Sequence, residues 1–122
     1  MKREMRLHPR VGVDMPAELE PYGSDSLDVR LVNLSVGGAL IEGSEQLESL
    51  LNAVRHPESG VPVEVNLHFG LEEGPVHCHC RLIHTRRLAQ SRYQMGMKIL
   101  SLASDCQDML SRFVESRLQA HH

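Results

Sequence analysis

Polar and apolar residues alternate along much of the chain, which is the pattern of β-strands that bury one face. In the first such stretch the apolar residues are all odd-numbered: Val11, Val13, Met15, Ala17 and Leu19. Similar stretches follow, separated by clusters of turn-forming residues. Together they predict six strands, at about residues 13–20, 27–33, 39–42, 63–69, 76–85 and 93–100.

Two segments show helical spacing instead. The first begins after Ser44, a residue type that favours helix N-termini, and its apolar positions are Leu47, Leu50, Leu51 and Val54. The second begins near Ser104 and carries a continuous stripe of Cys106, Met109, Leu110, Phe113, Val114 and Leu118. The whole pattern predicts a mainly β domain of the α+β class, a small antiparallel barrel with a short surface helix and a C-terminal helix.

Length and charge narrow the possible functions. The chain has 122 residues, the usual size of one compact domain, and a formal net charge of −3 with histidine neutral. Binding to DNA or RNA generally needs a broad basic surface, so no nucleic-acid polymer is expected as a partner. Positive charge is concentrated in the first ten residues, where Lys2, Arg3, Arg6 and Arg10 oppose only Glu4. A basic segment on an acidic domain suggests that a small anion binds there.

Cysteine usage and hydropathy suggest the compartment. The cysteines number three, Cys78, Cys80 and Cys106, and the first two would point the same way along a strand. This arrangement suggests reduced thiols and not a disulfide framework. No apolar run approaches the length of a membrane span and no signal-like segment precedes the domain. We therefore expect a cytoplasmic protein without membrane insertion.

Two short motifs carry the chemistry. Residues 6–10 read Arg-Leu-His-Pro-Arg and offer two guanidinium groups, which match phosphate oxygens and stack on flat rings. Residues 33–38 read Asn-Leu-Ser-Val-Gly-Gly and offer an amide, a hydroxyl and glycines that let backbone approach a ligand. Separately, such arginines are usually solvated and such turn residues are usually structural. Their combination favours an anionic, planar, hydrogen-bonding ligand, and a nucleotide fits best.

The two motifs resemble those of the PilZ family, bacterial receptors for the second messenger cyclic di-GMP, in which RxxxR precedes (D/N)xSxxG. Arg6 and Arg10 match the first motif, and Asn33, Ser35 and Gly38 match the second. The resemblance covers almost the whole chain, because the strand pattern and the last helix are similar to those of small stand-alone members. It implies one domain overall, with a flexible arm at residues 1–12 and a six-stranded antiparallel PilZ barrel with a C-terminal helix at residues 13–122.

The resemblance also implies a binding site for cyclic di-GMP, with no other cofactor. Its expected residues are Arg6, Leu7, His8, Arg10, Asn33, Ser35, Gly37, Gly38 and His84. The arginines are expected to hold phosphates, and Asn33 and Ser35 to contact guanine or nearby polar atoms. His84 lies where the family often has a flat ring beside the ligand, and the alternative is an ordinary strand histidine. Binding is expected to order the arm and to signal to a protein effector, as in motility or biofilm control.

The residue before the first motif arginine influences, in the family, how many messenger molecules bind. An arginine there favours an intercalated dimer of cyclic di-GMP, whereas this chain has Met5. A thioether adds no positive charge to balance a second ligand. One ligand per chain is therefore expected, with Arg3 as the alternative source of charge.

The segment from His77 to Cys80, followed by His84, contains the ligand types that zinc prefers. Strand alternation sends the histidines to one face and the cysteines to the other, so no metal is expected. No nucleophile motif or phosphate loop is present, so the chain is interpreted as a receptor and not an enzyme. The alternatives are a PilZ-like interaction module without nucleotide binding, in pilus or flagellar control, and, more distantly, a metal-dependent enzyme.

Overall fold

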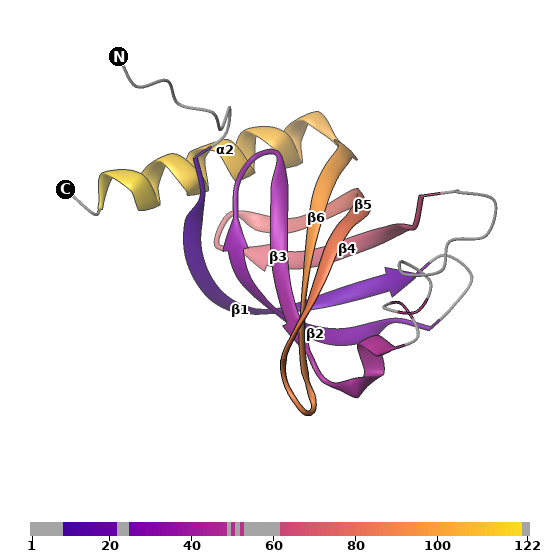
Figure 1. Cartoon of the computed structure of the whole chain (residues 1–122). Helices are drawn as coiled ribbons and strands as arrows, with labels where there is room; N and C mark the ends of the chain where they lie inside the picture. Colours follow the sequence, from indigo (N-terminus) through magenta and orange to yellow (C-terminus); the bar gives the residue numbers. More distant parts are fainter. Residues whose placement is uncertain (1–8, 22–24, 49, 51, 53–61, 121–122) are drawn as a thin grey trace, which may run out of the picture.

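The computed structural model describes residues 9–21, 25–48, 50, 52 and 62–120. Six antiparallel strands close into a barrel in the order β1-β2-β3-β6-β5-β4, and helix α2 (Ser104–Gln119) lies across one end (Figure 1). The strands are β1 (Val11–Pro21), β2 (Leu27–Leu34), β3 (Gly38–Gly43), β4 (Glu64–Leu71), β5 (Gly74–Ala89) and β6 (Arg92–Leu102). The predicted mainly β barrel with a C-terminal helix is confirmed.

The inside of the barrel is filled by alternate side chains of the strands. In β1, Ala17 and Leu19 are buried while Pro16 and Glu18 are exposed, as the sequence pattern predicts. The side chains with almost no exposed surface are Leu19, Leu31, Leu34, Ile41, Leu47, Val65, Leu67, Val76, Cys80, Met95 and Leu110. Because these side chains occupy the interior, a ligand has to bind on the outer wall or at an end.

Helix α2 buries one stripe against the barrel. Cys106, Leu110 and Val114 are buried, and the helix contacts β5 and β1. These three residues follow one another at helical spacing and belong to the stripe predicted from the sequence. The helix therefore covers the end of the barrel at which β1 begins.

The hairpin of β5 and β6 is longer than predicted. β5 continues to Ala89 and β6 begins at Arg92, and the two form the long orange hairpin of Figure 1. The ladder contains irregularities between Leu82 and His84 and between Arg87 and Ala89. Such bulges interrupt the period of two, so the alternation fades before the strands end.

The predicted surface helix is only partly within the described residues. After Ser44 the chain forms a short 3₁₀ helix, η1 (Glu45–Leu47), and the Ser44 side chain makes no capping hydrogen bond. Leu47 and Leu50 are buried, as predicted. Leu51 and Val54 lie outside the described side chains.

Gly43, at the end of β3, leaves no room for a side chain. A Cβ atom there would lie 2.7 Å from Cδ1 and 3.0 Å from Cγ of Leu47, which is fully buried. We expect Gly43→Ala to lower the free energy of unfolding by about 1 to 3 kcal/mol through overpacking, measured by urea denaturation. Gly70→Ala is the matched control, because a Cβ at Gly70 meets no atom within 4 Å. Equal losses in the two variants would contradict this explanation.

Candidate functional site

The second motif forms a tight turn between β2 and β3, and Ser35 is central to it. The Ser35 N–H donates to the carbonyl oxygen of Gly38 at 2.9 Å, and the Ser35 hydroxyl accepts from the Gly37 N–H at 3.1 Å. Ser35 is only 5% exposed. Its hydroxyl therefore shapes the turn, a role that the sequence alone did not separate from ligand contact.

The turn of residues 35–38, called the motif turn below, is hydrogen-bonded to β6. The carbonyl oxygen of Gly37 accepts a hydrogen bond from the Ile99 N–H at 3.0 Å, and Gly38 pairs with Lys98. A Cβ atom at Gly38 would lie 3.0 Å from the carbonyl oxygen of Met97. Glycine at this position therefore allows the two backbones to approach each other.

Asn33 offers an unused hydrogen-bond acceptor at the end of β2. It lies between Gly12 of β1 and Leu40 of β3 in the ladder, next to a β-bulge. Its Oδ1 atom is buried, and no described residue donates a hydrogen bond to it. Buried polar atoms without partners are rare in native proteins and reduce stability. The Asn33 acceptor is therefore without a donor among the described residues.

Arg10, the last residue of the first motif, directly precedes β1. Val11 pairs with Leu34, and extending this register by one residue brings Arg10 beside Ser35. Arg10 is exposed. The remaining predicted residues of this segment lie outside the described part of the chain: Met5, Arg6, Leu7 and His8.

His84 of β5 lies on the same outer side of the barrel as Asn33, and this side is called the outer wall below. It pairs with Gly96 of β6, and its ring lies over Gly96, where a Cβ atom would collide with His84 Nε2. The ladder continues from Gly96 to Leu40 and from Leu40 to Asn33. The backbones of His84 and Asn33 are three strand spacings apart, which is about 14 Å. The predicted ring, amide and turn thus lie along one outer wall.

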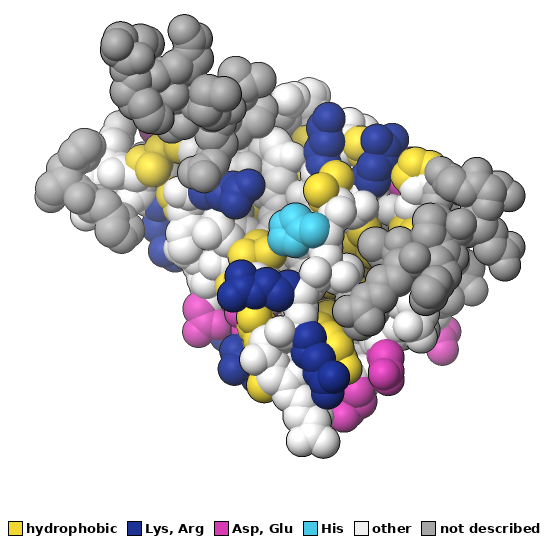
Figure 2. All heavy atoms as spheres, viewed as in Figure 1, with side chains coloured by type: hydrophobic (Ala, Val, Ile, Leu, Met, Phe, Trp, Pro, Cys, Tyr) yellow, Lys and Arg dark blue, Asp and Glu magenta, His cyan; other side chains and the backbone are white. Residues whose placement is uncertain are grey.

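Basic side chains gather on this wall. Figure 2 shows Lys and Arg side chains around a histidine on the face formed by β3, β6 and β5. A hollow of about 450 Å³ lies between the motif turn, β6 and α2, and its lining includes Val36, Gly37, Lys98, Leu100, Gln107 and Ser111. The local charge favours an anion, although the whole chain has a net charge of −3.

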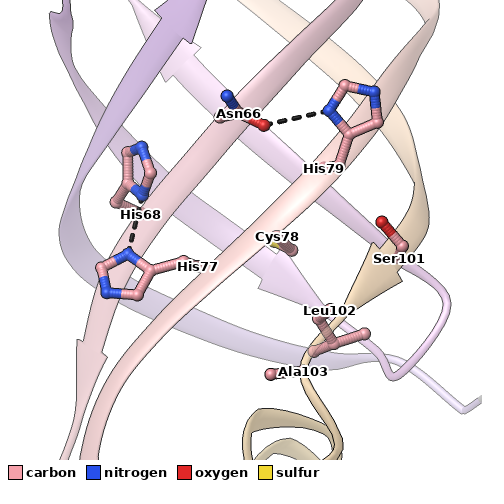
Figure 3. Close-up of a pocket in the computed structure, with 8 residues that line it drawn as sticks. All are labelled: Asn66, His68, His77, Cys78, His79, Ser101, Leu102 and Ala103. Atoms are coloured by element: carbon pink, nitrogen blue, oxygen red, sulfur yellow. Dashed lines mark hydrogen bonds between the residues drawn. The ribbon is translucent and has the colours of Figure 1, made fainter.

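A second cluster of polar side chains lies on β4 and β5, away from the motif turn. His68 Nδ1 and His77 Nδ1 are 2.8 Å apart, and His79 Nδ1 lies 3.0 Å from Asn66 Oδ1 (Figure 3). Cys78 points to the other side of β5, into the barrel. The predicted separation of histidines and cysteines onto opposite faces is therefore confirmed. Among the residues that the structure describes, no three potential metal ligands converge.

The cysteines are core residues. Cys78, Cys80 and Cys106 are buried and free of disulfides. The Cys80 thiol donates to Cys78 Sγ at 3.8 Å. This hydrogen bond lowers the pKa of Cys78 and raises the pKa of Cys80, which burial raises further. The pair therefore contributes to packing, as predicted.

Solved structures share this barrel. The Bacillus subtilis inhibitor of motility, MotI/DgrA, matches with a TM-score of 0.74 at 12% identity, over 97% of this chain and 53% of that chain. The PilZ domain of YcgR from Escherichia coli with cyclic di-GMP matches with a TM-score of 0.59 at 18% identity, over 97% and 95% of the two chains. The PilZ domain of CeSA from a cellulose-synthesizing bacterium matches with a TM-score of 0.57 at 19% identity, over 93% and 99%. The present chain thus spans about half of MotI/DgrA but nearly all of the two isolated domains.

These identities are low, so the structural matches establish the fold alone. No curated protein sequence matches the chain. The family model of the PilZ domain, however, matches residues 4–116, which is nearly the whole sequence. With both motifs in order and the barrel in place, the chain belongs to the PilZ family.

Proposed function

We propose that this PilZ domain is a receptor for cyclic di-GMP. The observation that carries the proposal is the unpartnered Oδ1 of Asn33, at the junction of β1, β2 and β3. The edge of guanine carries N–H donors that match such an acceptor. YcgR, MrkH and PlzA have been solved as complexes with cyclic di-GMP, which supports the same ligand here.

In this proposal the arginines of the first motif hold the phosphates. Arg10 directly precedes Val11, which pairs with Leu34 of the second motif, and Arg6 lies four residues earlier in the sequence. A guanidinium fork binds phosphate oxygens in pairs and stacks on a purine. On the other side of the wall the exposed His84 ring offers a second flat surface for guanine. The glycines of the turn leave room for the ligand.

Signalling is proposed to follow from the N-terminal arm. Phosphate binding neutralises Arg6 and Arg10 and holds residues 1–10 against the barrel, which changes the surface offered to a protein effector. We propose a receptor without enzymatic activity that acts in the cytoplasm. No helix in the described part of the chain is long and apolar enough to cross a membrane. MotI/DgrA is an inhibitor of motility, which supports motility as one process to test.

Calorimetric titration with cyclic di-GMP tests the proposal, with GTP and cyclic AMP as controls. Saturable binding of cyclic di-GMP alone supports a messenger receptor. The second candidate is a PilZ-like interaction module that has lost nucleotide binding, and absence of cyclic di-GMP binding would favour it. Metal analysis of the purified protein separates the more distant possibility of a metal-dependent enzyme.

Arg6→Ala and Arg10→Ala test the phosphate contacts. Each should weaken binding by about 1.5 to 3 kcal/mol, because a charge-assisted hydrogen bond is lost. Arg10→Lys should also lose much of the affinity, since an ammonium lacks the planar fork. Arg112→Ala on α2 is the matched control, because Arg112 forms an exposed ion pair with Glu73 at 2.6 Å. Unchanged affinity in both Arg6→Ala and Arg10→Ala would refute this site.

The arm hypothesis predicts a change in amide exchange. Residues 1–10 contain several like charges and few apolar side chains, so only an anion is expected to hold them on the barrel. We expect slow amide exchange in this segment with cyclic di-GMP and fast exchange without it. Strand β4 serves as an internal reference that should change little. Equal protection of residues 1–10 in both states would contradict arm ordering.

The stoichiometry of binding tests the effect of Met5. We expect one cyclic di-GMP per chain, because Met5 supplies no charge to balance a second molecule. Met5→Arg should move the ratio measured by calorimetry from one towards two. Met5→Gln, which is polar but uncharged, should leave it at one. Two ligands bound by the unmodified protein would show that another residue, such as Arg3, supplies the charge.

A further inference from the structure

Two cations face each other across β5 and β6 on the outer wall of the barrel. Arg81 of β5 pairs directly with Lys98 of β6, and each is flanked along its strand by buried residues. Directly opposed residues of antiparallel strands have Cβ atoms about 5 Å apart, and like charges at that separation destabilise the sheet. An anion bound between the two side chains would remove this repulsion.

Arg81 is not compensated by the described residues around it. Glu64 lies on its other side in the ladder, but the Glu64 carboxylate is 2.6 Å from Nε2 of His79. The Nε atom of Arg81 is buried and has no hydrogen-bond acceptor among the described residues. By contrast, Arg30 on the same barrel has its Nε 2.7 Å from Asp14.

The Arg81–Lys98 pair lies next to the motif turn. Lys98 pairs with Gly38, the last residue of the second motif. Lys98 also lines the hollow that includes Gly37. A ligand at the motif turn is therefore one strand spacing from Lys98 and two from Arg81, or about 5 and 10 Å.

We propose that Arg81 and Lys98 form a phosphate subsite that binds a phosphate group of the nucleotide held at the motif turn. This inference rests on the proposed function and extends its site by two residues outside both motifs. The guanidinium provides a fork for phosphate oxygens, and the ammonium provides a second charge at the same group. The same chemistry also accepts phosphate from another source, so the test includes inorganic pyrophosphate.

Calorimetry with cyclic di-GMP on single variants tests the subsite. Arg81→Gln and Lys98→Gln should each weaken binding about tenfold or more, and Arg81→Lys should recover part of the loss. Arg112→Gln is the control, because Arg112 lies on α2 and is ion-paired with Glu73. It should change the affinity less than about threefold. Equal losses in Arg81→Gln and Arg112→Gln would indicate a general charge effect and overturn the subsite.

Thermal denaturation supplies a readout that does not depend on the messenger. Without ligand, Arg81→Gln should keep or raise the melting temperature, because a repulsion is removed, whereas a purely structural arginine would lower it. Pyrophosphate should raise the melting temperature of the unmodified protein more than that of Arg81→Gln. If cyclic di-GMP binds both proteins equally, the subsite is wrong and the proposed function stands. If it binds neither, the proposed function fails, and the pyrophosphate shift alone supports or overturns the subsite.

Discussion

Closure of the barrel through β1 is the constraint on which the rest of the structure depends. β1 pairs with β2 from Val11 to Leu19 and with β4 from Ala17 to Pro21, so it joins the two edges of the sheet. The first pairing brings the residues before Val11 to the end of β2, where the second motif begins. The two motifs are far apart in the sequence, and the pairing of β1 with β2 brings the end of the first motif to the start of the second.

Two glycines allow close packing on the outer wall near the second motif. At Gly38 the absence of a Cβ allows the motif turn to lie against the Met97 carbonyl, and at Gly96 it admits the ring of His84. A side chain at either position would displace these neighbouring groups. The candidate site is thus a polar surface on the barrel wall beside a hollow of about 450 Å³.

Two buried side-chain atoms of the barrel have no hydrogen-bond partner among the described residues, namely Asn33 Oδ1 and Arg81 Nε. Further round the barrel, His79 contacts both Glu64 and Asn66, so its polar atoms are paired. Natural proteins depart from full hydrogen bonding mainly at functional sites, where a ligand completes the set. One acceptor and one donor left open on the same barrel are consistent with a ligand that carries both kinds of group.

By itself the sequence determined the class of fold and the two motifs, because both are local patterns. Period-two alternation predicted the six strands, and Asn33 and Ser35 were expected at a strand end, where they lie. Only the tertiary structure decided that the Ser35 hydroxyl closes the turn and that Arg81 opposes Lys98. The register of β5 on β6 includes bulges, which leave no period-two signal. Strand pairing and barrel closure bring together residues that are distant in the chain. They therefore decide which side chains come into contact and which lack partners.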